Sequence, residues 1–508
     1  MPSMPSMPSM PSEVTVVRDA SRHRLYFDLL DSFRQPGCPI CRLGSRTATR
    51  YLDILAYENV NDPGEREKLR AARGFCNYHA YRFLEEMKDL LAVGIIYRDV
   101  VHTVVLALSD GESPLAQGVR SLLHPDSGDL CEDHGLARLI SPTRPCPACQ
   151  ALADGAADRL HAFLEHLPEE DFRAAYEQSD GLCYPHFREA LGEVGDDGAL
   201  RLLVESALGR LARPLDQAPD GAVAASAGLV GSAFGERGAI SRENQASQVF
   251  GRARGKRVRS DETRQEAGAS ARPDPDSCPV CRRIEAPAMR VVEEFGREIS
   301  TDHERGGEQL ESVCNRHAWQ LVRVSGDELL PALAVLSKRR RAQVSALAPK
   351  ILAAEGEKSG LELPVELPGR PSRTRRAGRE LAHALSPRTP CPLCERQDEL
   401  EQAELLRFVS GLAEVDGQDG REGREEQVET ICIPHLVHSC HLSCHLRLSA
   451  AERERLVRRE VQGWTDLVAE LKEYIRKVDF RFRDEPRGHE QTSPYHAVEQ
   501  MVGRRGIR

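Results

Sequence analysis

The sequence predicts a mainly α-helical fold of four small modules, each held by a Cys3His metal site and arranged as two homologous halves. Three observations predict it. Ala, Leu, Glu and Arg dominate the chain, and these side chains lose little conformational freedom in a helix. A Cys-Pro-x-Cys pair occurs four times. Each of these pairs is followed, at a nearly constant distance, by a Cys-x-x-His pair.

The two kinds of pair alternate along the chain. The first pairs are CPIC, CPAC, CPVC and CPLC, and the second pairs are CNYH, CYPH, CNRH and CIPH. Each Cys-Pro-x-Cys pair is separated from the Cys-x-x-His pair that follows it by 34, 33, 32 and 37 residues in turn, counted between the nearest cysteines of the two pairs. We therefore expect each first pair to share a metal ion with the second pair that follows it. The candidate ligands are Cys38, Cys41, Cys76 and His79; Cys146, Cys149, Cys183 and His186; Cys278, Cys281, Cys314 and His317; and Cys391, Cys394, Cys432 and His435.

The segments between the pairs have helical patterns. In the first module, "NDPGEREKLRAARG" has an Asn or Asp that can cap a helix, Pro in the first turn and Gly beyond the end. Two helices are expected between the paired ligands. The second pair opens a further helix, "CNYHAYRFLEEMKDLLAV", which places Cys76 and His79 three residues apart on one face.

The repeats also differ in kind, which predicts the domain organisation. The Cys-x-x-His pairs of the first and third modules read Cys-Asn-x-His-Ala, whereas those of the second and fourth modules read Cys-x-Pro-His. This alternation indicates duplication of a two-motif unit. We expect a low-complexity leader at 1–13, one unit at 14–215, a disordered basic linker at 216–276, a second unit at 277–482 and a flexible tail at 483–508.

The ligand set favours zinc, with about four Zn²⁺ ions per chain. Structural zinc takes four N or S ligands, commonly three thiolates and one imidazole in closely spaced pairs. Proline after the first cysteine fixes φ, and a helix N-terminus favours the thiolate over the thiol. Each bound zinc ion could add roughly 10 kcal/mol of apparent folding free energy.

Other chemistries explain less of the pattern. A redox Cys-Pro-x-Cys pair needs a βαβ context and does not explain a recurring histidine. An iron–sulfur cluster accepts mixed Cys and His ligands, so this alternative, with electron transfer or thiol-based redox sensing, stays open. Ordinary buried cysteines would not recur with a histidine at a fixed distance. Four protein ligands leave no open position for water on the metal ion. The Pro-Cys-x-x-Cys stretches also lack the His-x-Glu that nucleobase deaminases require, so an enzyme is the less favoured class.

Six further Cys and His residues lie outside the periodic pattern. They are candidates for a fifth metal site or a redox-sensitive thiol, although a Cys/His-rich helix surface near the fourth site is the favoured explanation of the later four. The residues are Cys131, His134, Cys440, His441, Cys444 and His445.

Charge and hydropathy limit the partners. The net charge of −10 argues against a body that coats nucleic acid, although the basic runs at 252–259 in the linker and at 337–341 leave local contacts to nucleic acid open. The most apolar stretch, 90–108, carries Arg98 and Asp99 at its centre and is interpreted as a buried helix rather than a membrane span. The leader lacks a signal-peptide pattern, so we expect a cytoplasmic protein.

Finally, "GFCNYHAYRFLEE" with "CPICRLG" upstream resembles an uncharacterised prokaryotic family of Cys-Pro-x-Cys…Phe-Cys-x-x-His proteins, known only as a domain of unknown function. The resemblance is clearest over residues 25–110 and implies metal ligands at these cysteines and histidines. The sequence as a whole predicts a non-catalytic, zinc-binding helical scaffold or adaptor. Its expected partner is a protein, with nucleic acid as a lesser alternative.

Overall fold

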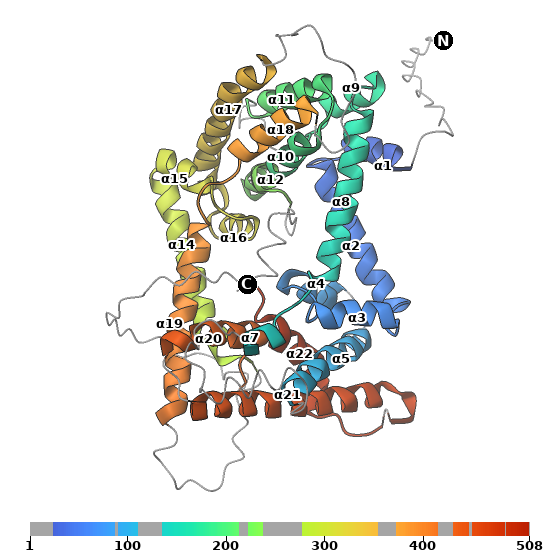
Figure 1. Cartoon of the computed structure of the whole chain (residues 1–508), viewed down its shortest axis with the longest axis vertical. Coiled ribbons are helices and arrows are strands. Elements are labelled where there is room, and N and C mark those ends of the chain that lie inside the picture. Colours follow the sequence, from blue (N-terminus) through green and yellow to red (C-terminus); the bar gives the residue numbers. More distant parts are fainter. Residues whose placement is uncertain are drawn as a thin grey trace, which may run out of the picture.

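The computed structural model describes most of the chain. The described residues are 24–86, 90–109, 135–212, 222–236, 277–353, 372–414, 430–446, 450–482 and 484–506. Within these ranges every regular element is an α-helix or a short 3-10 helix (Figure 1). The predicted mainly α-helical class is therefore confirmed.

The first half of the molecule, residues 24–236, is built around two long helices that run in opposite directions, α2 and α8 (Figure 1). Shorter helices lie at the two ends of this pair. The helices are α1 (Arg24–Phe33), α2 (Pro39–Tyr57), α3 (Pro63–Ala71), α4 (Asn77–Glu86), α5 (Leu90–Ser109), α7 (Gly135–Ile140), α8 (Pro147–His166), α9 (Glu170–Gln178), α10 (Tyr184–Glu193), α11 (Asp197–Arg210) and α12 (Ala222–Phe234).

The second half, residues 277–506, repeats this plan with α14 and α19 as its long helix pair. Its α-helices are α14 (Pro279–Thr301), α15 (His303–Leu310), α16 (Asn315–Ser325), α17 (Leu330–Ala353), α18 (Arg373–Ala384), α19 (Pro392–Glu414), α20 (Ile433–Leu446), α21 (Ala450–Val478) and α22 (Ser493–Val502). The 3-10 helices are η2 (Gly326–Leu329), η4 (Phe480–Phe482) and η5 (His489–Thr492).

The two halves pack against each other at both ends of their long helices, and equivalent elements meet. Helix α5 of the first half lies against α21 and α22 of the second, and α17 of the second half lies against α11 and α12 of the first. In the same way, α7 contacts α20 while α18 contacts α10. The long pair α2/α8 stands opposite α14/α19 (Figure 1). The chain therefore has the approximate twofold arrangement of a dimer made within one polypeptide.

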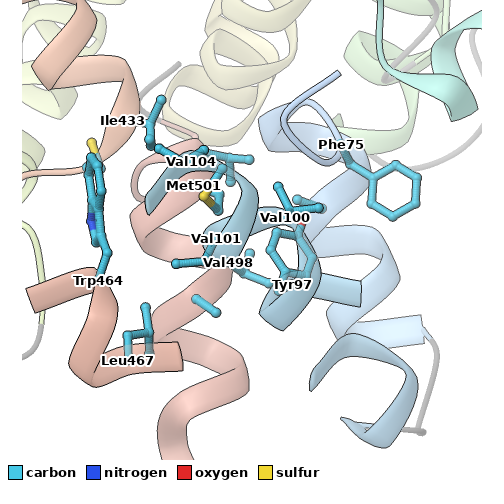
Figure 2. Close-up of a cluster of buried hydrophobic side chains, with 14 of the residues drawn as sticks. Phe75, Tyr97, Val100, Val101, Val104, Ile433, Trp464, Leu467, Val498 and Met501 are labelled. Atoms are coloured by element: carbon cyan, nitrogen blue, oxygen red, sulfur yellow. The ribbon is translucent and has the colours of Figure 1, made fainter. Parts of the chain in front are cut away.

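The core at one of these contacts is centred on α5. Its side chains Val100, Val101 and Val104 are buried, and Figure 2 shows them beside Val498 of α22 and Trp464 of α21. Helix α5 is long and apolar enough to cross a membrane, and half of its apolar window is buried inside the molecule. Its Asp99 accepts hydrogen bonds from Arg66 and Arg70.

Part of the predicted disordered linker is folded. Residues 222–234 form α12, and Val230 and Phe234 are buried in a core with α16 and α17. Ala, Gly and Ser dominate this segment, but Val230 and Phe234, four residues apart, give it one apolar face. Residues 213–221 and 237–276 lie outside the described residues.

The predicted flexible tail also differs from the structure. Helix α22 is almost entirely buried, with Ala497 and Val498 fully inside the core. The indole N–H of Trp464 donates to the Gln500 side-chain oxygen over 3.3 Å. The tail carries no Cys or His ligand, so the ligand pattern could not place it in the core.

Candidate metal centres

Four groups of cysteine and histidine side chains converge in the structure. In each group three sulfur atoms and one imidazole nitrogen lie within 4.8 Å of one another. The groups are cluster 1 (Cys38, Cys41, Cys183, His186), cluster 2 (Cys76, His79, Cys146, Cys149), cluster 3 (Cys278, Cys281, Cys432, His435) and cluster 4 (Cys314, His317, Cys391, Cys394). All sixteen predicted ligand candidates fall in these groups, so four Cys3His clusters are present.

The pairing of the ligands differs from the sequence prediction. No module supplies all four ligands of a cluster. In each half, the Cys-Pro-x-Cys pair of one module meets the Cys-x-x-His pair of the other module, and this occurs in both directions, which gives two clusters. Helix lengths explain the exchange. Helix α2 has 19 residues and is about 28 Å long, so it carries the chain away from Cys41, whereas α3 has only 9 residues and cannot return it. Cys76 therefore arrives beside the start of α8, the helix that runs the opposite way.

Each ligand pair lies at the start of a helix. Cys38, Cys146 and Cys278 are N-cap residues, and proline follows each of them. Proline lacks a backbone N–H, but at the first helical position an N–H would have no partner within the helix, so nothing is lost. Cys183 and Cys314 are likewise N-caps of α10 and α16. Two helix N-termini thus point at each cluster, and their positive dipole ends favour thiolate sulfur.

The distances within the clusters fit one ion each. A tetrahedral zinc ion with Zn–S bonds of about 2.3 Å separates its sulfur ligands by about 3.8 Å. The closest sulfur pairs lie 3.6, 3.5, 3.8 and 3.8 Å apart in clusters 1 to 4. Every histidine turns Nδ1 toward the sulfurs, as in His186, whose Nδ1 lies 3.5, 3.3 and 3.2 Å from the sulfurs of Cys38, Cys41 and Cys183. A disulfide would need about 2.05 Å, so these are groups of separate thiols.

The electrostatics of the clusters favour charged ligands. Burial alone would lower the pKa of His79, but the thiolate of Cys76 and the hydrogen bond with Cys146 raise it to about 10. His317 behaves in the same way, with its pKa raised to about 9 by Cys314 and Cys391 against the effect of burial. In each cluster one cysteine has a lowered pKa, to which hydrogen bonds from the other thiols contribute; these are Cys38, Cys76, Cys278 and Cys314. Burial and the neighbouring thiols raise the pKa of another cysteine in each cluster, namely Cys183, Cys149, Cys432 and Cys394. Without a metal ion, each cluster therefore holds a protonated imidazole beside one thiolate. A divalent cation would take the place of that proton at the centre of negative charge.

The outer nitrogen of each imidazole has a different environment. In cluster 3, His435 Nε2 lies 2.7 Å from the buried carboxylate of Glu401. In cluster 4, His317 Nε2 lies 2.9 Å from the side-chain oxygen of Gln397. Such partners fix the tautomer and the orientation of a ligating imidazole. In cluster 2, His79 Nε2 is buried without a hydrogen-bond partner among the described residues.

Most ligands are closed off from solvent. Clusters 1 and 3 are buried throughout, and only Cys76, Cys314 and Cys394 of the other two are partly exposed. Three thiolates and one imidazole complete a tetrahedral coordination sphere. Such a site holds secondary-structure elements together and leaves no position for a reacting water molecule.

The six additional candidates do not add a fifth cluster within the described residues. Cys440 lies on α20 outside the four groups, and burial raises the pKa of its thiol to about 12. It is therefore protonated at neutral pH, which disfavours thiol redox chemistry. Cys131 and His134 lie outside the described residues, as do the side chains of His441, Cys444 and His445.

The basic run at 337–341 is divided between the core and the surface: Arg340 is buried, whereas Lys338 and Arg341 are exposed. Arg340 is buried, with its guanidinium 4.0 Å from the centre of the Tyr184 ring, and donates to the Ala233 carbonyl oxygen over 2.7 Å. Arg339 donates to Glu311 over 2.8 Å. The other basic run, 252–259, lies outside the described residues.

Sequence analysis missed the residues that support the clusters. Gln397 and Glu401 lie on α19, three and seven residues after Cys394, but no local pattern marks them as partners of a histidine. Asn77 and Asn315 do have a signal, because they are the asparagines that distinguish Cys-Asn-x-His from Cys-x-Pro-His. Both asparagines contact the backbone of the opposite half.

Comparison with known proteins extends the resemblance seen in the sequence. The chain is 36% identical over 75 residues to an uncharacterised 23.9 kDa protein in the xynA 3' region of Caldicellulosiruptor sp. (strain Rt8B.4). This alignment covers 15% of the chain and 36% of that relative's length. No solved structure matches the chain. Residues 25–197, which include all eight ligands of clusters 1 and 2, match the model of a family of unknown function, DUF6062.

Proposed function

We propose that the protein is a non-catalytic scaffold whose four Cys3His clusters each hold one structural zinc ion. The observation that carries the proposal is the spacing of the ligand atoms, all within 4.8 Å of one another in each group. This spacing suits a single ion. An iron–sulfur cluster places several irons and sulfides between its protein ligands, which then stand farther apart.

The position of the clusters supports a structural role for the metal. Each cluster joins the start of a long helix to the start of a short helix from the neighbouring module, as in cluster 1 with α2 and α10. A metal ion there fixes both ends of each antiparallel helix pair. Aromatic residues make up only 5% of the chain, and about 10 kcal/mol of apparent folding free energy per ion would be a large contribution.

Metal analysis of the purified chain tests this proposal. We expect about four zinc ions per chain and a colourless solution. Iron with acid-labile sulfide, together with visible absorption, would contradict it and favour the electron-transfer alternative. Removal of the metal by a chelator should lower the melting temperature, because a structural ion contributes directly to folding.

The biological role proposed for this scaffold is that of a cytoplasmic adaptor for protein partners. Closed coordination supports a non-catalytic role, and the net charge of −10 disfavours nucleic acid as the main partner. Affinity capture from cell extract should compare the intact chain with a variant that lacks residues 237–276. A partner that is captured by both, and lost after metal removal, would support recognition by the helical body.

Nucleic-acid binding has a separate test. The segment 252–259 carries five Arg and Lys residues within eight positions, so binding to short RNA or DNA should require it. Fluorescence anisotropy at two salt concentrations measures this directly. Salt-dependent binding by the intact chain but not by the variant without 237–276 would favour nucleic acid over a protein partner.

A further inference from the structure

Two short segments leave the C-terminal ends of equivalent helices through a glycine with a positive φ. The first follows α12 and begins "FGERG" at Phe234; the second follows α22 and begins "VGRRG" at Val502. The glycine at the second position of each has a positive φ, +83° at Gly235 and +74° at Gly503. Glycine adopts this conformation at a helix C-terminus without the penalty that a Cβ would bring. The turn leaves several carbonyl oxygens facing outward, and we refer to the two segments as glycine turns.

Asn77 of the first half binds the glycine turn of the second half. Its side-chain nitrogen lies 3.0, 3.2 and 3.0 Å from the carbonyl oxygens of Val502, Gly503 and Arg504. Its side-chain oxygen accepts from the Gly506 N–H over 3.1 Å. One amide side chain therefore contacts both ends of the turn.

Asn315 of the second half binds the glycine turn of the first half in the same way. Its side-chain nitrogen lies 2.8, 3.1 and 3.1 Å from the carbonyl oxygens of Phe234, Gly235 and Glu236. The same pattern therefore appears twice, with donor and acceptor halves exchanged. A contact that recurs under the twofold relation is a property of the fold rather than of one loop.

An aromatic donor one helical turn after each asparagine completes the site. The hydroxyl of Tyr81 donates to the Gly503 carbonyl oxygen over 3.1 Å. The indole N–H of Trp319 donates to the Gly235 carbonyl oxygen over 3.0 Å. Both donors are four residues after their asparagine and so lie on the same helix face. Each site thus offers an amide and an aromatic donor to the backbone of a glycine turn.

Each glycine turn also lies against a metal centre of its own half. The N–H of Arg504 donates to the sulfur of Cys281 over 3.4 Å, and a Cβ at Gly503 would lie 3.6 Å from the sulfur of Cys432. Both cysteines belong to cluster 3. In the first half, a carboxylate oxygen of Glu236 lies 3.0 Å from the Cβ position of Gly37, the residue before Cys38 of cluster 1.

We propose that Asn77 with Tyr81 and Asn315 with Trp319 form two equivalent binding sites for a glycine turn, and that each bound turn couples two metal centres in opposite halves. Cluster 2 is coupled to cluster 3, because Cys76 of cluster 2 directly precedes Asn77. Cluster 4 is coupled to cluster 1, because Cys314 of cluster 4 directly precedes Asn315. The coupling concerns metal retention and therefore rests on the proposed function, but the binding of the turns does not.

The physical basis of the coupling is a shared backbone segment. Asn77 follows Cys76 directly, so opening of cluster 2 moves the side chain that holds the turn. Release of the turn then removes the N–H donor from Cys281 and uncovers cluster 3. Hydrogen bonds to metal-bound sulfur and outer contacts of this kind stabilise the bound ion.

The test compares two full-length variants, Asn77→Ala and Asn315→Ala. Their cysteines are alkylated under native conditions, and the modified sites are mapped by mass spectrometry. For Asn77→Ala we expect Cys281 and Cys432, in the opposite half, to react about 10-fold faster than in the unmodified chain. Cluster 1 and cluster 4 cysteines should react at the unmodified rate. Asn315→Ala should show the reverse, with Cys38 and Cys41 exposed instead.

A third variant approaches the same coupling from the other side. Deletion of residues 503–508 removes the glycine turn without changing any residue next to cluster 2. It should expose Cys76 and Cys149 as well as cluster 3, with helical content unchanged by circular dichroism. Exposure of cluster 3 alone in the deletion, together with exposure of cluster 2 alone in Asn77→Ala, would overturn the coupling. So would equal exposure of all four clusters in either variant.

The outcome for the metal itself is separate. If the unmodified chain contains no zinc, the proposed function fails, whereas the pairwise pattern of thiol exposure still tests the two binding sites. If the chain contains zinc but the exposure is not pairwise, the proposed function stands and the coupling fails.

Discussion

The sulfur atoms of Cys76 and Cys149 lie 3.5 Å apart, and they join the start of α4 to the start of α8. Cys149 belongs to the module that follows the one containing Cys76. Because cluster 1 joins the same two modules at the other end of α2 and α8, neither module can close its metal centres alone. The folding unit is therefore the pair of modules, which agrees with the extent of the family match over residues 25–197.

Replacement of Cys76 by serine tests this exchange directly. The variant should bind about one zinc ion fewer, because a three-ligand cluster holds zinc weakly. Alkylation should then modify Cys146 and Cys149, the partners of Cys76 in space. Modification of Cys38 and Cys41 in their place would contradict the exchanged pairing. Cys38→Ser is the matched control and should expose Cys183 rather than Cys76.

The outer partners of the histidines predict different metal affinities. A carboxylate makes a ligating imidazole more basic than an amide does, so cluster 3 with Glu401 should hold zinc more tightly than cluster 4 with Gln397. Glu401→Gln should weaken retention at cluster 3 by about 10- to 100-fold. Competition with a coloured chelator, followed by mapping of the exposed cysteines, measures the change. Release of cluster 4 zinc before cluster 3 zinc in the unmodified chain is the accompanying expectation.

The buried carboxyl of Glu460 predicts a pH dependence of stability. Burial raises its pKa well above the usual value, while it accepts the N–H of Ile431 beside cluster 3. Between its unfolded and folded pKa values the folded chain binds more protons, so this group lowers the free energy of unfolding as pH rises. Glu460→Gln should remove this loss of stability at higher pH, because glutamine does not ionise. The stability gained by the variant should therefore grow as the pH rises above about 5, where an unfolded glutamate is ionised.

Chemical denaturation at several pH values measures this difference. Glu473→Gln is the control, because Glu473 is exposed and Arg476 lowers its pKa to about 2. Its effect on stability should not change with pH above about 5, where the carboxylate is ionised in both states. A constant difference for Glu460→Gln across the same range would contradict the assignment of a neutral carboxyl.

The buried guanidinium of Arg340 should be important for the contact between the halves. It lies over the rings of Tyr184 and Phe234 and donates to the Ala233 carbonyl oxygen, all of which belong to the first half. Arg340→Ala should lower the free energy of unfolding by about 2–4 kcal/mol, from lost cation–π and hydrogen-bond contacts. Arg341→Ala, at an exposed neighbour, should change it by less than about 0.5 kcal/mol. Equal effects in a urea titration would refute this role.

The ligands could be predicted from the sequence because each pair is local. Cys-Pro-x-Cys and Cys-x-x-His fix the direction of two side chains within one helical turn, so Cys38 with Cys41 and Cys183 with His186 are recognisable without tertiary structure. Which pairs meet depends on how far α2 and α8 carry the chain, and that requires helix lengths and directions. The near-constant spacing between the pairs suggested that neighbouring pairs along the chain share an ion, but the exchanged pairing is compatible with the same spacing.

The supporting residues could be predicted only in part. Asn77 and Asn315 were visible as a difference between repeats, but their partners Val502 and Phe234 lie 425 and 81 residues away along the chain. Glu401 reaches His435 from another helix, and Arg340 was part of a charge run that usually faces solvent. In each case the environment is created by packing between the halves, which no short stretch of sequence encodes.

The twofold arrangement within one polypeptide has a consequence for how the four centres can differ. A dimer of identical chains would contain two kinds of centre, each present twice. Here Glu401 lies seven residues after Cys394, while Ala156 occupies that place after Cys149, so the corresponding clusters 3 and 1 have different surroundings. A single polypeptide therefore allows each of the four clusters its own surroundings, and with them its own affinity for a metal ion, which a dimer of identical chains does not.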